Sequence, residues 1–127
     1  MRELILDTNV FLRFFLKDIL PQTIKARKLL QQAKTGKILI IVPQIVIFEI
    51  VFAFEKLYKF PKTEIIDKIN VLLGTNYLKI QDKEIFGEAV LLFQRHNLSL
   101  PDCFIHSYAK QNNASVFSFD KNLNKLG

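Results

Sequence analysis

The sequence of 127 residues has a single cysteine, Cys103, and only two histidines. One thiol cannot form an intrachain disulfide, and this scarcity fits a protein of the reducing cytoplasm. A typical structural zinc site needs several Cys or His ligands, so the isolated pair of Cys103 and His106 indicates such a site only weakly. We therefore expect Cys103 to be a small buried hydrophobic residue.

The chain also lacks an apolar run of the roughly 20 residues that a membrane-spanning helix needs. The best candidate, Ile38 to Phe54, is shorter and contains Pro43 and Glu49. A strand followed by a buried helix that begins at Pro43 explains this segment better. Basic residues interrupt the apolar segment Val10 to Leu20, and no small-residue cleavage site follows it, which argues against a signal peptide. We expect a soluble protein with no membrane partner.

Half of the residues are apolar, which excludes a disordered tail protein, and the length predicts one domain over residues 1–127. Lys and Arg number 18 against 12 Asp and Glu, for a formal net charge of +6. A surplus of this sign favours a polyanionic partner, although many soluble proteins carry one.

Repeats, low-complexity tracts and linkers are also missing. Along the chain, short apolar runs typical of buried strands alternate with segments whose apolar residues have helical spacing. We expect four strands, at Glu3–Leu6, Ile38–Val42, Tyr77–Ile80 and Ser115–Ser118. The expected helices run from Thr8 or Asn9 to Leu16, over Thr23–Thr35, Gln44–Tyr58 and Pro61–Gly74, and over Lys83–His96 and Pro101–Gln111. Strands that alternate with helices predict an α/β sandwich with a mostly parallel sheet.

Two acidic residues follow expected strands near opposite ends of the chain. Asp7 comes directly after Leu4-Ile5-Leu6, and Asp120 follows the last strand. Ligands of open parallel sheets bind outside the carboxyl ends of the strands, where these two side chains would lie. Alternatively, Asp7 is an ordinary turn or cap residue, and Asp120 caps a short C-terminal helix.

Glu49 interrupts the apolar helix expected after the second strand. Its neighbours three and four residues away are all apolar, so burial would require a compensating cation or a raised pKa. The alternative is an exposed stripe shared with Lys56, seven residues further on.

Asp102 follows Pro101 in the first turn of a helix, where the helix dipole favours a negative charge and supplies a structural explanation. In a crossover sheet, this helix start and Glu49 can face the same edge as Asp7 and Asp120. Four carboxylates without a competing His or Cys cluster form an all-oxygen ligand set, which favours Mg²⁺ or Mn²⁺ over zinc.

These residues resemble the PIN-domain ribonucleases, in particular the small VapC-type toxins of toxin–antitoxin modules. The resemblance covers essentially the whole chain and consists of Leu6-Asp7-Thr8-Asn9-Val10, Glu49, Pro101-Asp102-Cys103 and Phe117-Ser118-Phe119-Asp120. It implies a single α/β/α sandwich with a 4–5-stranded sheet in the order 3-2-1-4(-5). It also implies that Asp7, Glu49, Asp102 and Asp120 are the metal-binding catalytic quartet, supported by Asn9 and Ser118. The chain departs from the pattern at Asn122, where many relatives carry a further acid, so that one-metal chemistry stays open.

The resemblance further implies hydrolysis of RNA by metal-activated water, leaving 5′-phosphate and 3′-hydroxyl ends. Candidate contacts for the RNA phosphates are Arg13, Lys17 and Lys121. Toxins of this type form homodimers and bind a small antitoxin protein, so both partners are expected. A patch among Phe11, Phe14, Phe15, Phe52 and Phe54 is a candidate surface for such contacts.

Three alternatives remain open. The closest is a PIN nuclease that matures RNA rather than acting as a toxin. A non-catalytic interaction module would use its acids only as helix caps. A receiver or phosphatase domain needs a second acid beside the first-strand aspartate, where this chain has Asp7-Thr8-Asn9.

Overall fold

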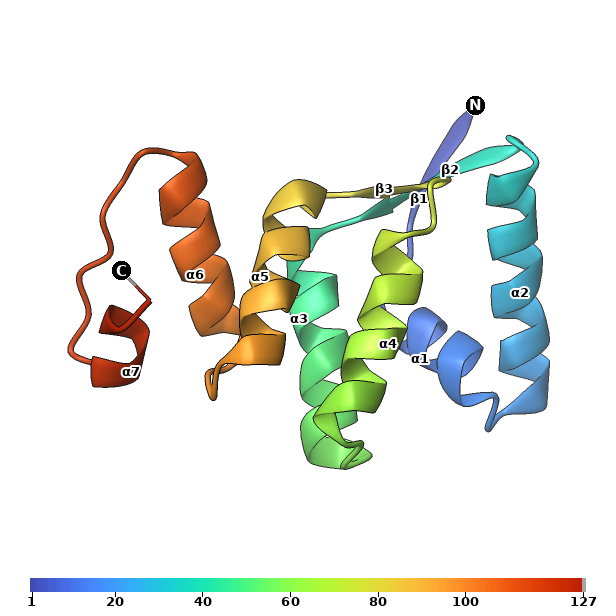
Figure 1. Cartoon of the computed structure of the whole chain (residues 1–127). Coiled ribbons are helices and arrows are strands. Elements are labelled where there is room, and N and C mark those ends of the chain that lie inside the picture. Colours follow the sequence, from blue (N-terminus) through green and yellow to red (C-terminus); the bar gives the residue numbers. More distant parts are fainter. Residues whose placement is uncertain (127) are drawn as a thin grey trace. The chain divides into compact units, whose positions relative to one another are not determined.

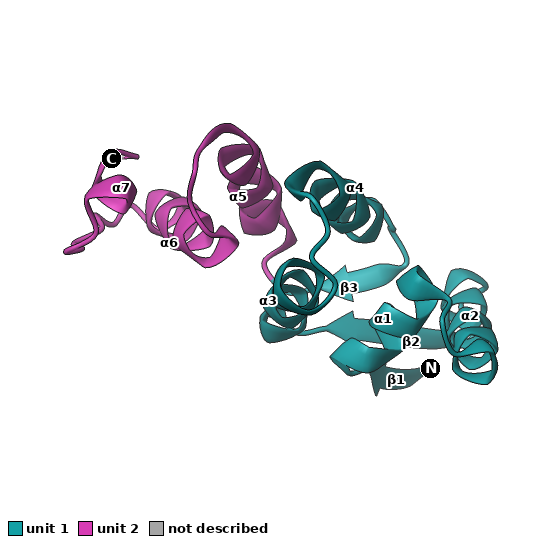
Figure 2. Ribbon diagram, turned by 90° about the horizontal axis from the view of Figure 1, so that it is seen from below, with its two compact units in different colours: residues 1–81 teal, residues 82–127 magenta. Residues whose placement is uncertain are grey.

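The computed structural model describes residues 1–126 and divides the chain into two compact units, Met1–Gln81 and Asp82–Gly127 (Figure 2). The first unit contains three strands and most of the helices, and the second contains helices alone. Within residues 1–126, no helix is both long and apolar enough to cross a membrane.

The sheet of the first unit consists of three parallel strands, β1 (Arg2–Ile5), β2 (Ile38–Val42) and β3 (Leu78–Ile80), in the order β1-β2-β3. β2 lies in the middle, pairing Ile38 with Arg2 on one side and Ile40 with Leu78 on the other. This position explains its uninterrupted apolar sequence, since a central parallel strand is covered on both faces. In contrast, β1 is an edge strand, and Ile5 at its end is 65% exposed.

Helical crossovers connect the strands, as parallel pairing requires (Figure 1). β1 leads into α1 (Thr8–Leu16) and α2 (Leu20–Lys34), and β2 leads into α3 (Gln44–Phe52). A π-helical turn, η1 (Ala53–Leu57), continues α3, and α4 (Lys62–Leu73) precedes β3. Helix α1 contacts both α2 and α3, so the segments that follow the first two strands lie against each other.

Large apolar side chains fill the core of the first unit. Those almost completely buried include Phe11, Ile40, Ile47, Phe54 and Ile69. Each comes from a position that the helical or strand period directs inward, which is why the order of elements was predictable from periodicity.

The turn η1 interrupts the single helix expected from Gln44 to Tyr58. The backbone N–H of Tyr58 donates to the carbonyl of Ala53, five residues earlier, at 3.0 Å. Such an i to i+5 bond widens the helix by one residue and changes the direction of the side chains that follow. Tyr58 is thereby placed to contact α1, as described below.

The second unit consists of α5 (Lys83–Arg95), α6 (Leu100–Gln111) and the single-turn α7 (Lys121–Asn124). Helices α5 and α6 pack together, with the rings of Phe86 and Phe104 centred 4.8 Å apart. Leu100 and Cys103 are fully buried, which confirms the expectation for the lone cysteine.

The structure confirms an α/β fold with a parallel sheet and most of the expected helices, but the expected 4–5 strands are wrong: three are present in residues 1–126. The segment Ser115–Ser118 forms no strand. Its valine and phenylalanine favour extended backbone, but a strand also needs a partner, and the described residues of its own unit offer none.

Candidate active site

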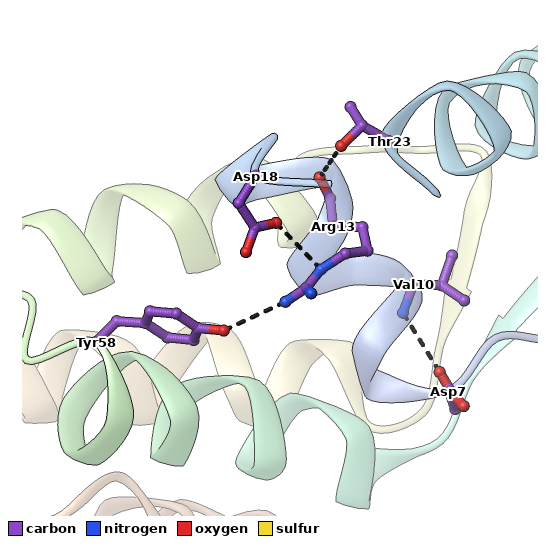
Figure 3. Close-up of polar contacts among 6 residues, drawn as sticks. All are labelled: Asp7, Val10, Arg13, Asp18, Thr23 and Tyr58. Carbon is purple, nitrogen blue, oxygen red and sulfur yellow. Dashed lines mark hydrogen bonds and ion pairs between the residues drawn. The ribbon is translucent and has the colours of Figure 1, made fainter. Parts of the chain in front are cut away.

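Asp7 lies two residues beyond the end of β1 and is the N-cap of α1. Its backbone is extended, and its Oδ1 accepts a hydrogen bond from the N–H of Val10 at 3.3 Å (Figure 3). The cap is therefore Asp7 itself, the structural alternative given for this residue, and the helix begins at Thr8. A cap of this kind satisfies one free N–H of the first helical turn and fixes the direction of the carboxylate. The side chain is exposed, and its second oxygen accepts no hydrogen bond within the described chain.

Glu49 is connected to the residue next to Asp7. The hydroxyl of Thr8 donates to Oε1 of Glu49 at 3.1 Å, across 41 residues of sequence. Thr8 is the first residue of α1 and Glu49 lies in the middle of α3, so the bond joins the segments that follow β1 and β2. The structure thus places Glu49 beside the first residue of α1, and its part in a metal site stays a prediction.

The surroundings of Glu49 are more open than its apolar neighbours suggested. Ile45 and Phe52, four residues before and three after it, are each 60% exposed, and Lys56 on the same stripe is also exposed. Glu49 therefore lies on an exposed face of the helix together with Lys56, as the alternative proposed. The apolar residues Ile45 and Phe52 are exposed beside it. Exposure removes the need for a buried counter-ion but leaves the carboxylate accessible to a ligand.

Asp102 lies in the first turn of α6, as expected. The hydroxyl of Ser99, the N-cap, accepts a hydrogen bond from the N–H of Asp102 at 3.2 Å. The half-buried carboxylate accepts no hydrogen bond from residues 1–126. The backbone of this acid is therefore fixed locally, and its side chain is free to bind a ligand.

Asp120 is the N-cap of α7. Its Oδ1 accepts from the N–H of Asn122 at 2.8 Å, and its own N–H donates to Oγ of Ser118 at 2.9 Å. Asp120 thus caps the short C-terminal helix α7, as the structural alternative proposed. This capping role does not exclude catalysis, because one carboxylate oxygen stays available. Ser118 thus contacts the backbone of the acid, and its supporting role in the site stays a prediction.

The four acids fall into two pairs, Asp7 with Glu49 in the first unit and Asp102 with Asp120 in the second. Their convergence in one pocket stays a prediction. Within residues 1–126, no three Asp, Glu, His or Cys side chains are grouped closely enough to hold a metal ion.

The donor chemistry of the four residues nevertheless suits a hard divalent cation. All four ligands are carboxylates, which Mg²⁺ and Mn²⁺ prefer. None of the four forms an ion pair with a Lys or Arg side chain in the described part of the chain. Their negative charges are therefore available to a bound cation.

Arg13, a candidate phosphate contact, is held by other residues of the first unit (Figure 3). Its side chain is 14% exposed, with Nε 3.3 Å from Oδ1 of Asp18, and its Nη2 donates to the hydroxyl of Tyr58 at 3.2 Å. The carbonyl of Arg13 accepts from the hydroxyl of Thr23 at 3.0 Å. Arg13 thus connects α1, the start of α2 and the end of η1, a structural role that the sequence analysis missed.

The other polar candidates are exposed. Lys17 ends α1 in a left-handed conformation with φ of 56°, Lys121 is the first residue of α7, and Asn9 lies in the first turn of α1. Both lysines are free to approach a polyanion.

The proposed aromatic patch is only partly exposed. Phe11 and Phe54 belong to the core, at 1% and 0% exposure, whereas Phe52 is 60% exposed. Phe14 and Phe15 are half-buried and stack edge to face, with centroids 5.4 Å apart. Periodicity alone did not separate core phenylalanines from surface ones in this nearly all-apolar region.

Thr8 is the functional candidate that sequence reasoning overlooked. It was considered only as a helix cap, and nothing in a single sequence indicates a contact over 41 residues. The available signal was its place beside Asp7, at the edge where Glu49 was expected.

Comparison with known proteins supports the resemblance. The family model described as "PIN domain" matches residues 4–127. A curated relative, the "VapC ribonuclease" of Aquifex aeolicus (strain VF5), is 29% identical over 87 residues, covering 68% of this chain. The matched region spans 64% of the length of that relative.

Proposed function

The chain belongs to the PIN domain family, and from this premise we propose that it is a metal-dependent endoribonuclease. In this proposal Asp7, Glu49, Asp102 and Asp120 together bind the catalytic ion. The relative described as a VapC ribonuclease supports RNA as the substrate.

The observation that carries the proposal is the hydrogen bond between Thr8 and Glu49. It holds an acid of α3 beside the residue that follows Asp7, at the edge of the sheet where ligands of parallel sheets bind. A helix cap needs only local contacts, so this bond over 41 residues between two elements supports a role for Glu49 beside Asp7.

The four carboxylates would hold Mg²⁺ or Mn²⁺. When bound, such an ion supplies a Lewis acid that polarises the phosphate and lowers the pKa of the attacking water. The capping bonds of Asp7 and Asp120 fix the orientation of their carboxylates, and Thr8 does the same for Glu49. Asn9 and Ser118 complete the support of the site.

The RNA backbone would be held by basic residues of the two units. Lys17 and Lys121 are exposed and suited to bind phosphates, whereas Arg13 would contribute mainly through its field, because Asp18 and Tyr58 already contact it. Neutralising RNA phosphates releases counterions, so we expect binding to weaken steeply with salt.

We further propose a cytoplasmic toxin that forms a homodimer and is inhibited by a small antitoxin protein. The relative named a VapC ribonuclease supports the ribonuclease activity of such a toxin, and the homodimer and the antitoxin are proposed from the resemblance. A PIN nuclease for RNA maturation would share the same site chemistry, and an adjacent gene for a small antitoxin would distinguish the two.

The decisive experiment incubates end-labelled RNA with purified protein in Mn²⁺, in Mg²⁺ and in EDTA. We expect cleavage only with the ions, leaving 5′-phosphate and 3′-hydroxyl ends. Calorimetry with Mn²⁺ on the same preparation provides an independent measurement of ion binding. Absence of both cleavage and ion binding would favour the non-catalytic interaction module.

A further inference from the structure

A cavity of about 290 Å³ lies between α1 and α2 and reaches Asp7. Its walls come from one end of each helix: Asp7, Asn9, Val10 and Arg13 on the α1 side, and Gln22, Lys25, Ala26 and Leu29 on the α2 side. The four α2 residues are spaced i, i+3, i+4 and i+7, which places them on one stripe of the helix. The cavity thus belongs entirely to the first unit and begins at an acid of the proposed site.

The walls of the cavity are mostly apolar, with polar groups at a few points. Ala26 is fully buried, and Val10 and Leu29 are half-buried. Gln22 and Lys25 are exposed, so that an amide and an ammonium group are available to a ligand. Asn9 adds a second amide next to Asp7.

This combination suits one ligand chemistry. A nucleobase has apolar faces and a polar edge of donors and acceptors, and amides of Asn and Gln can match both kinds of group on such an edge. RNA is read mostly through unpaired bases that are turned out of a helix and packed against side chains. The cavity is slightly smaller than the roughly 300 Å³ at which pockets for drug-sized ligands begin, which fits a single base.

We propose that this cavity binds one unpaired nucleotide of the RNA, next to the phosphate that is cleaved. The base packs against Val10 and Leu29, its edge meets the amides of Asn9 and Gln22, and its phosphate lies near Lys25. Arg13 contributes to the wall, since its guanidinium is already engaged by Asp18. The inference rests on the proposed ribonuclease function and adds to it a residue set that selects single-stranded RNA and one base position.

Helix α2 offers matched control positions for the experiment. Gln31 and Lys34 each lie nine residues after Gln22 and Lys25, on the opposite side of the helix, and both are exposed. Single variants Gln22→Ala, Lys25→Ala, Gln31→Ala and Lys34→Ala therefore change the same side chains inside and outside the cavity. Thermal unfolding verifies that all four fold.

Two measurements are made on the full chain. Anisotropy of fluorescent single-stranded RNA octamers in EDTA reports binding, and sequencing of the ends cut from a random RNA pool in Mn²⁺ reports base preference. We expect Lys25→Ala to lower the slope of log affinity against log salt by about one, and Gln22→Ala to weaken the preference at one base position roughly five- to tenfold. Gln31→Ala and Lys34→Ala should match the parent.

The outcomes separate this inference from the proposed function. Cleavage by the parent with no difference between cavity and control variants would overturn the nucleotide site and leave the nuclease standing. RNA binding that depends on Lys25, without any cleavage, would overturn the nuclease and retain the site. A parent that neither binds nor cuts RNA would overturn both.

Discussion

The two units differ in how their acids are positioned, although Asp7 in the first unit caps its own helix just as Asp120 does in the second. In the first unit, a side-chain hydrogen bond joins two helices through Thr8 and Glu49, which are 41 residues apart in sequence. In the second, Asp102 and Asp120 are each positioned by the cap of their own helix. The contrast shows that local helix chemistry suffices to present a carboxylate, whereas relating one carboxylate to another requires tertiary packing.

The largest expected effect comes from Asp7→Asn and Asp120→Asn. Both should lower the cleavage rate by more than about 100-fold, because each removes a charge that would bind the ion. Asn is as good an N-cap as Asp, so the free energy of unfolding of Asp7→Asn should stay the same or rise slightly as like-charge repulsion is relieved. Rates on labelled RNA and urea unfolding measure the two quantities.

A parent-like rate for Asp7→Asn would remove that residue from the catalytic site. If only Asp120→Asn retained activity, its capping role would be its whole function, and Asp102 would be the one acid that the second unit contributes to the site.

Thr8→Val tests the connection that distinguishes the first unit. The substitution keeps the branched shape but removes the hydroxyl that orients Glu49, and we expect activity and Mn²⁺ affinity to fall about 10–100-fold. Thr8→Ser, which retains the hydroxyl, should stay near the parent. Equal rates for Thr8→Val and Thr8→Ser would show that the hydrogen bond has no role in the site.

Arg13→Met probes the scaffold of the first unit rather than its chemistry. The substitution retains apolar bulk but removes the contacts with Asp18 and Tyr58, and we expect a loss of about 1–2 kcal/mol in unfolding free energy. Tyr58→Phe removes only one hydroxyl and should lose less, about 0.5–1 kcal/mol. Denaturant titration measures both; a larger loss for Tyr58→Phe would contradict the central role of Arg13.

The smallest effect is expected at Lys59, which has a left-handed backbone with φ of 53° after η1. Glycine adopts this conformation without steric cost, so Lys59→Gly should raise the unfolding free energy by about 0.5–1 kcal/mol. Lys56→Gly, inside η1, is the control and should lower it by a similar amount. An unfolding free energy of Lys56→Gly above that of the parent would show that glycine carries no helical cost within η1.

Much of the fold was predictable because burial follows periodicity. Ile38–Val42 was predicted with its observed bounds, and the helix around Phe86 and the one opening at Pro101 differ from prediction by one residue at one end. The failure at Ser115–Ser118 has a specific cause: propensity describes the chain locally, whereas a strand depends on a partner elsewhere.

The positions of the candidate acids were predictable to the level of element ends, whereas their meeting in one site stays a prediction. That Asp7, Asp102 and Asp120 lie at helix starts follows from local rules for caps and first turns. The bond from Thr8 to Glu49 and the enclosure of Arg13 could not be foreseen, since both depend on the distance between segments far apart in sequence.

The wide turn at Ala53–Leu57 holds one residue more than a regular helical turn would. Deleting one residue there, such as Glu55, would let regular α-helix replace the wide turn and leave the direction of the following side chains nearly unchanged. Deleting a residue from the regular helix α3 would instead rotate everything downstream by roughly 100°, and the phenol of Tyr58 would lose the guanidinium it now meets. A single-residue deletion should therefore be tolerated better in this stretch than in the helix that precedes it.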